Sequence, residues 1–343
     1  MPSGVLGASV AMTTYNGERF LDCQLESIAA QTVHPTELVL CDDCSTDQTI
    51  AIATKFAERA PFPVRIFRNN SNVGFTRNFR KAAEKCSGDL IAFCDQDDWW
   101  HPTRLEVCIS RFRDPDVQLF YHNAWVVDER GDKLGLLYDR RSEATATDPA
   151  RPFPFHASYG LTQIFRSNLR RFDDMWSQSL NHVGTKPDIL AHDQWYFFLA
   201  QTLGKVVFED VRLVEYRQHD SNLVGASWVR PTLRKRFLGR IGHRGRDDAR
   251  RAAGARSRAT ILRMMQEREC SLKARLDTRA RLYDLLARRL ERRASTYSDT
   301  GLGRRFRHLI ESWRKGDYSD WPWGFDSRSV IRDFFSGVLL AKL

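Results

Sequence analysis

Short apolar runs alternate with helix-like segments along the first half of this chain, and this alternation limits its fold most strongly. The runs are Ala8 to Thr13, Glu37 to Cys41, Val64 to Phe67 and Leu90 to Cys94. Such runs are typical of strands buried on both faces of a parallel sheet. The intervening segments place apolar residues three and four apart, as crossover helices do. They are Phe20 to Ala30, Asp47 to Arg59 and Thr76 to Cys86. The pattern predicts an α/β fold with a doubly wound sheet flanked by helices.

Polar residues follow three of the four predicted strands. They are Thr13 to Gly17, Asp42 to Asp47 and Asp95 to Asp98. Ligands of such sheets bind beyond the carboxyl ends of the strands, so these segments are the candidate site. Ser45, Thr46 and Asp47 also suit the simpler role of capping the next helix. Asp42 and Asp43 should repel each other, and we expect a ligand donor or a cation to offset that repulsion.

The segment Asp95-Gln96-Asp97-Asp98 carries three carboxylates within four residues. Carboxylate oxygens are the ligands that Mg²⁺ and Mn²⁺ prefer, and open coordination positions would accept phosphate oxygens. The segment therefore predicts a site for one of these ions. The alternative is an acidic turn that caps a helix starting near Pro102.

Charge divides the chain into an acidic body and a basic tail. The formal net charge is +10, yet residues 1–229 carry 24 Lys and Arg against 30 Asp and Glu, whereas residues 230–343 carry 29 against 13. We expect a domain at 1–229, with a first half at about 1–115 and a second half at about 116–229. A basic, mostly helical appendage at 230–343 follows.

The tail predicts amphipathic helices between about Thr232 and Ser295, because apolar residues recur among its arginines. Examples are Ile261, Leu262, Met264, Met265, Leu282, Leu285, Leu286 and Leu290. Contact with the inner membrane surface is the first expectation, and Asp333 to Leu340 either adds an apolar anchor or packs on the body. A solvated or oligomerising appendage is the alternative. Nucleic acid is not expected as a partner.

Composition also bears on where the chain works. No run of about 18 apolar residues and no charged leader with a cleavage site is present, so we expect neither a membrane span nor secretion. The seven cysteines are scattered, and Cys41-x-x-Cys44 has no second pair or nearby histidine to complete a zinc site. We expect a cytoplasmic protein, peripheral on the inner face of the membrane.

The polar segments together resemble the successive motifs of family 2 glycosyltransferases, which have the GT-A fold. The matching segments are Val10 to Gly17, Val39 to Thr49, Asn72 to Phe75, Gly88 to Ile91 and Asp95 to Asp98. Further segments resemble the acceptor-half motifs of the bacterial polysaccharide branch, which includes rhamnosyltransferases of O-antigen, capsule and cell-wall assembly. These are Gly160 to Thr162, His192 to Trp195 and Tyr216 to His219, with Asn222 and Gly225.

The resemblance implies a role for each matching residue. Thr13 and Asp43 would hold a uracil or thymine base, with Asp42 a weaker choice. Arg77 would lie near the nucleotide, Asp95 near the ribose, and Arg217 near the diphosphate. Asp97 would be the principal metal ligand, assisted by Asp98 and His219. Asp193 would be the catalytic base of an inverting enzyme. Tyr15, Asn72, Gly74 and Gln96 belong to the same nucleotide-sugar motifs.

The implied function is metal-dependent, inverting transfer of a sugar from a dTDP-sugar or UDP-sugar to a cell-surface glycan or lipid-linked acceptor. Rhamnose is the first choice of sugar, and a UDP-hexose or UDP-N-acetylhexosamine donor is the alternative. A non-catalytic basic protein with a degenerate transferase body is the competing interpretation. Cys44 stands where the family commonly has glycine and Gln194 where an aromatic often sits, which puts the local backbone at Cys44 in doubt.

Overall fold

The computed structural model describes residues 6–138, 155–182, 188–219, 244–318, 330, 331 and 333–339. The chain divides into two compact units. The sheet unit comprises Met1–Pro149, His156–Asp173 and Ala191–Ala226, and the helical unit comprises Ala150–Phe155, Asp174–Leu190 and Ser227–Leu343. The boundary expected after residue 229, with Asn222 and Gly225 of the acceptor motifs, lies outside the described residues.

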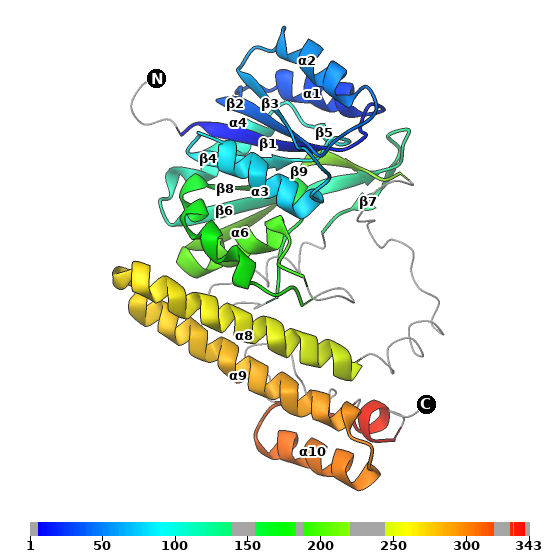
Figure 1. Cartoon of the computed structure of the whole chain (residues 1–343), viewed down its shortest axis with the longest axis vertical. Coiled ribbons are helices and arrows are strands. Elements are labelled where there is room, and N and C mark those ends of the chain that lie inside the picture. The colour runs from blue at the N-terminus through cyan, green and yellow to red at the C-terminus, as the bar shows by residue number, and fades with distance from the viewer. Residues whose placement is uncertain are drawn as a thin grey trace. The chain divides into compact units, whose positions relative to one another are not determined.

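Nine strands of the described residues form one mixed sheet in the sheet unit (Figure 1). Its order is β3-β2-β1-β4-β8-β6-β9-β5, and β7 pairs with β6. The strands are β1 (Ala8–Thr14), β2 (Glu37–Asp42), β3 (Val64–Arg68), β4 (Leu90–Cys94), β5 (Trp99–Trp100), β6 (Val117–Val127), β7 (Lys133–Leu136), β8 (Gln163–Arg166) and β9 (Lys205–Arg217). The first four strands are parallel, as predicted. The sheet becomes mixed at β8, which runs antiparallel to both β4 and β6.

Helices cover both faces of the sheet. Successive side chains of a strand point to opposite faces, so a strand of continuous apolar residues needs cover on both. The helices are α1 (Leu21–Ala29), α2 (Thr49–Ala57), α3 (Phe75–Lys85), α4 (Arg104–Ser110) and α6 (His192–Leu203), with the short η1 (Arg111–Arg113), η2 (Gly160–Thr162) and η3 (Ser167–Gln178). Val10 and Leu38 share a buried core with Leu25 of α1. On the opposite face, Phe79 of α3 packs against Phe93 of β4.

One strand differs from its prediction. The run from Val64 to Phe67 was expected to be buried on both faces, but β3 is only partly buried and Arg65 is exposed. The reason is its position, because β3 forms the edge of the sheet and has a single neighbour, β2.

The helical unit contains α8 (Arg244–Arg268), η4 (Cys270–Leu272), α9 (Lys273–Ser298), α10 (Leu302–Arg314) and η5 (Phe334–Leu339). Helices α8 and α9 lie side by side (Figure 1). None of the described helices is long and apolar enough to cross a membrane.

The apolar residues predicted to face a membrane from these helices have another role. Ile261, Leu262, Met265, Leu286 and Leu290 are buried. These side chains therefore do not form an exposed membrane-binding face. The physical reason is that each helix buries its apolar stripe against another helix.

Buried charges also hold the end of the helical unit together. Arg293 donates hydrogen bonds to Asp333, which also accepts hydrogen bonds from Tyr297 and Tyr318. Val338 packs with Leu309 and Tyr318 in a small apolar cluster. Asp333 and Val338 are therefore internal to the helical unit and are not part of a free apolar anchor.

Candidate active site

Two of the predicted loops are fastened together at the carboxyl edge of the sheet. The Tyr15 amide donates to Gln96 Oε1 at 2.9 Å, and Gln96 Nε2 donates to the Tyr15 carbonyl at 3.2 Å. A Cβ on Gly17 would lie 2.2 Å from Gln96 Oε1, so a larger residue there would displace the Gln96 side chain. The loop after β1 and the acidic turn after β4 therefore meet, while the Tyr15 side chain stays exposed.

Asp42 is buried at the end of β2 and is satisfied by the protein itself. Its carboxylate accepts hydrogen bonds from Thr14 Oγ1 at 2.9 Å, the Ser45 amide at 2.8 Å and Ser45 Oγ. Arg68 Nε lies 3.7 Å away. The expected external donor or cation is therefore unnecessary, because neighbouring hydroxyls and a guanidinium offset this charge.

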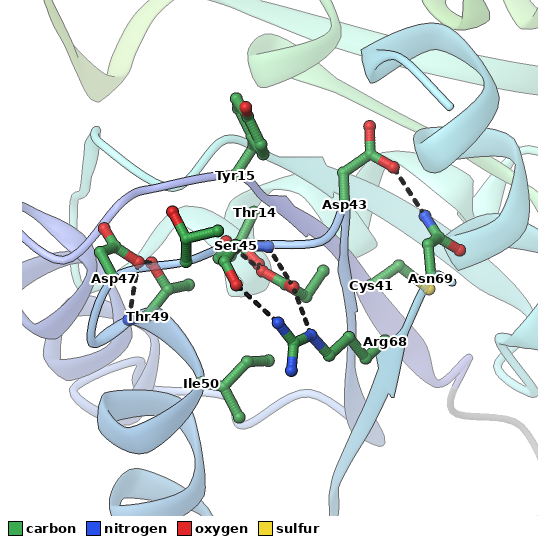
Figure 2. A network of polar contacts seen from close by, with 12 residues as sticks. Thr14, Tyr15, Cys41, Asp43, Ser45, Asp47, Thr49, Ile50, Arg68 and Asn69 are labelled. Carbon is green, nitrogen blue, oxygen red and sulfur yellow. Dashed lines mark hydrogen bonds and ion pairs between the residues drawn. The ribbon is translucent and has the colours of Figure 1, made fainter. Parts of the chain in front are cut away.

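Asp43 is held by amide donors, one of which is held in turn by a lysine, and we call this arrangement the amide relay. Its carboxylate accepts from the Val73 and Gly74 amides at 2.8 and 2.9 Å. It also accepts from Asn69 Nδ2 at 2.9 Å (Figure 2). Asn69 in turn accepts a hydrogen bond from Lys81 Nζ at 2.8 Å. Sequence reasoning missed Asn69 and Lys81, because a single polar residue in a loop or on a helix has no distinctive pattern.

The other residues expected around the nucleotide lie close to this relay. Thr13 is buried near the end of β1 and is paired in register with Cys41. Asn72 Oδ1 accepts from the Gly74 amide at 3.1 Å. Gly74 has φ of 83°, a conformation that favours glycine. Arg77 is exposed in the first turn of α3, where its guanidinium makes no hydrogen bond or ion pair with the described residues.

Cys44 stands where the family commonly has glycine, yet it keeps the backbone conformation that glycine would adopt. Cys44 adopts φ of 72°, the left-handed region that glycine enters easily. The turn after β2 thus keeps this geometry at a cost in local strain.

The acidic turn is tied to the end of β9. His219 Nε2 lies 2.9 Å from Asp97 Oδ2, and the Arg217 amide donates to Asp98 Oδ1 at 3.1 Å. Arg217 Nε donates to the Asp97 carbonyl at 3.1 Å. The turn does not cap the next helix, because α4 begins at Arg104 and the residue before it is Thr103. That alternative is therefore wrong.

A concentration of negative charge marks this part of the sheet unit. Burial raises the pKa of Asp95 to about 7, assisted by the charges of Asp97 and Asp193. Burial likewise raises the pKa of Asp98 well above its usual range, and Asp98 Oδ2 is buried without a hydrogen-bond partner among the described residues. Carboxylates crowded in this way favour a bound cation.

One internal cation, Arg104, partly offsets these carboxylates. Its guanidinium lies 3.6 Å from the ring centre of Trp100, and it donates to His122 Nε2 at 3.1 Å and to the Leu161 carbonyl at 2.7 Å. Its charge lowers the pKa values of Asp95 and Asp98 against the larger effect of burial. Sequence reasoning missed Arg104, since arginine in a first helical turn is ordinarily solvated.

The residues present fit a divalent cation whose remaining coordination positions would be filled by a bound ligand. No three His, Cys, Asp or Glu side chains of the described residues converge on one point as a metal cage. Asp97 and His219 supply two donor groups side by side. Mg²⁺ is commonly held by one or two carboxylates together with substrate phosphates and water, and Asp97 supplies one such carboxylate.

Asp193 occupies the first turn of α6. Its Oδ1 accepts from the Gln194 amide at 2.8 Å, and burial raises its pKa to about 6. The neighbouring His192 is stacked on Phe79 with ring centres 4.0 Å apart, and burial lowers its pKa to about 3. His192 is therefore neutral at physiological pH and packs as an aromatic ring beside the carboxylate.

Comparisons with known proteins agree with this architecture. The crystal structure of S. aureus TarS 1-349 is 17% identical, with a TM-score of 0.50 over 92% of this chain and 93% of that chain. That likeness shows the fold, which is the GT-A type. The dTDP-rhamnosyl transferase RfbG of Shigella flexneri is 28% identical over 222 residues, 63% of this chain and 74% of RfbG.

Residues 9–171 form a domain that matches the model of glycosyl transferase family 2. An uncharacterized glycosyltransferase of Nostoc sp. is 35% identical over 121 residues, 35% of this chain. The chain spans 37% of the length of that relative.

Proposed function

We propose that this protein is an inverting, metal-dependent glycosyltransferase that moves a sugar from a nucleoside-diphosphate sugar to a cell-surface glycan or lipid-linked acceptor. The observation that supports the proposal most directly is the contact of His219 Nε2, after β9, with Asp97 Oδ2, after β4, at 2.9 Å. This contact joins the acidic turn of the nucleotide half to the end of the acceptor half.

Each group has a task that suits its surroundings. Asp43 retains a carboxylate held by amide donors, which would accept the imide N–H of a uracil or thymine base. Asp97 and His219 would hold Mg²⁺ or Mn²⁺ beside the diphosphate, with Arg217 close by. The cation would neutralise the charge of the leaving nucleoside diphosphate.

Asp193 is suited to act as the general base. Its pKa of about 6 leaves it ionised at neutral pH while keeping it a stronger base than an exposed carboxylate. It would take the proton from the acceptor hydroxyl as that oxygen attacks the anomeric carbon, on the face opposite the leaving group. The product would have inverted stereochemistry.

We propose dTDP-rhamnose as the first donor to test, because the relative RfbG is named a dTDP-rhamnosyl transferase. UDP-hexoses and UDP-N-acetylhexosamines are the alternative donors. Asp43 does not distinguish these two classes of nucleotide, since uracil and thymine present the same imide group.

A donor panel tests the proposal. Wild type and Asp97→Asn would be incubated with dTDP-rhamnose, UDP-glucose or UDP-N-acetylglucosamine, Mn²⁺ and an extract of lipid-linked glycans, and released nucleoside diphosphate would be measured. We expect fastest release from dTDP-rhamnose and little from Asp97→Asn. No release from any donor, with wild type folded, would favour the non-catalytic alternative.

A further inference from the structure

Helix α10 exposes an apolar stripe that the helical unit does not use. Its buried residues are Arg305, Leu309 and Ser312. Leu302, Phe306 and Trp313 lie together on a neighbouring face, since residues about 3.6 positions apart share one side of a helix. These three side chains are between 44% and 63% exposed.

The stripe continues onto the last described segment of the chain. Phe334 contacts Phe306 with ring centres 6.2 Å apart, and it contacts Phe335 at 5.4 Å. Phe335 is 54% exposed. Leu302, Phe306 and Trp313 of α10, with Phe335 joined to them through Phe334, form what we call the apolar patch. Exposed apolar side chains that adjoin one another mark an interaction surface rather than scattered exposure.

Basic residues flank the patch. At about 100° per residue, Arg307 and Arg314 lie beside the stripe, on the side away from the buried face. Both are exposed, and neither makes a hydrogen bond or ion pair with the described residues. Neighbouring cations are neutralised, since Arg304 pairs with Asp299 and Lys315 pairs with Glu311. The free charge beside the patch is therefore positive.

We propose that the apolar patch docks on an anionic phospholipid surface, with Trp313 and Phe306 entering the headgroup boundary and Arg307 and Arg314 facing lipid phosphates. An apolar stripe bordered by basic residues is the pattern of helices that lie in the plane of a membrane. A second copy fits less well, because a symmetric contact through this patch would bring the arginines of both copies together.

The proposal does not depend on the donor sugar or on catalysis, so its test uses binding alone. Full-length protein would be sedimented with vesicles of phosphatidylglycerol and phosphatidylcholine, and with vesicles of phosphatidylcholine only. We expect binding to the anionic vesicles that weakens as salt rises, and little binding to the neutral ones.

Paired variants separate the apolar and the charged contributions. The double variant Leu302→Ser, Trp313→Ser should bind anionic vesicles about tenfold more weakly or worse. Burial of one aromatic side chain in the membrane contributes about that much to the affinity. Arg307→Gln with Arg314→Gln should weaken it about fivefold for each arginine. Leu134→Ser, an exposed leucine of β7 outside the patch, is the matched control and should bind as wild type.

Two outcomes would overturn the proposal. One is equal binding of the patch variants and wild type, with circular dichroism showing that all are folded. The other is absence of vesicle binding by wild type together with a dimer in sedimentation velocity that Trp313→Ser converts to monomer. That second result would assign the patch to a copy of the chain.

Discussion

His219 Nε2 lies 2.9 Å from Asp97 Oδ2, although 122 positions separate the two residues. The contact joins the turn after β4 to the turn after β9, which are brought close by the pairing of β5 with β9. A carboxylate and an imidazole at this separation could both coordinate one divalent cation. The pair is the centre of the functional interpretation.

Replacing His219 by alanine should weaken Mn²⁺ binding about tenfold to a hundredfold, because a ligand or a partner that orients Asp97 is lost. Calorimetric titration of Mn²⁺ in the presence of dTDP or UDP measures this. His34→Ala is the control, since His34 is an exposed histidine of the same unit far from the acidic turn in sequence. Unchanged Mn²⁺ affinity in His219→Ala would remove His219 from the site.

The pH dependence of activity should report Asp193. A base acts when deprotonated, so kcat/KM should fall tenfold per pH unit below about pH 6 and level off above it. His192 cannot supply this limb, because burial lowers its pKa to about 3. Measurement of kcat/KM between about pH 5 and pH 8 tests the assignment. A flat profile across pH 6 would contradict it.

Asp193→Asn should lower kcat about a hundredfold to ten-thousandfold while nucleotide binding is kept. Folding raises the pKa of this carboxyl above its unfolded value, so its ionised form costs stability as pH rises toward about 6. The variant should therefore be at least as stable as wild type at neutral pH. Loss of activity together with loss of stability would point to a structural role.

Gly160→Ala should crowd the His192 and Asp193 side chains. An added Cβ would lie 2.6 Å from His192 Nε2 and 3.6 Å from Asp193 Cβ. We expect a loss of stability of about 1–3 kcal/mol and a lower kcat, measured by denaturant unfolding and by initial rates. Gly303→Ala is the control, since nothing lies within 4 Å of its added Cβ. Equal behaviour of the two variants would contradict the packing argument.

Asn69→Ala should weaken dTDP and UDP binding about tenfold, because Asp43 Oδ1 loses a donor and Lys81 loses its acceptor. Asn70→Ala is the matched control, because the Asn70 side chain is exposed and makes no hydrogen bond with the described residues. Nucleotide affinity is measured by calorimetry. If both variants bound alike, the relay would have no part in holding the base.

The sequence predicted the sheet and its functional edge well. Strands β1 and β4 match their predicted runs to within one residue, because continuous apolar runs bounded by polar turns are distinctive. The prediction that the polar turns after the parallel strands would lie at one edge follows from strand order alone.

Contacts between distant residues were harder to predict. Asp42 and Asp43 are adjacent in sequence, yet Asp42 is satisfied by Thr14 and Ser45 while Asp43 is held by Asn69. Periodicity does not reveal such partners. Arg104 was missed for the same reason, since only the fold buries it beside Trp100. In the helical unit, the amphipathic pattern was predicted, but which apolar stripe stays exposed depends on how the helices pack.

Calorimetric binding of dTDP and UDP to wild type and Asp97→Ala, each with and without Mn²⁺, tests the central claim most directly. We predict that wild type binds at least one of these nucleotides more tightly with Mn²⁺, and that this gain disappears in Asp97→Ala. Failure of wild type to bind either nucleotide under both conditions would contradict the assignment of a nucleotide-sugar site to this edge of the sheet.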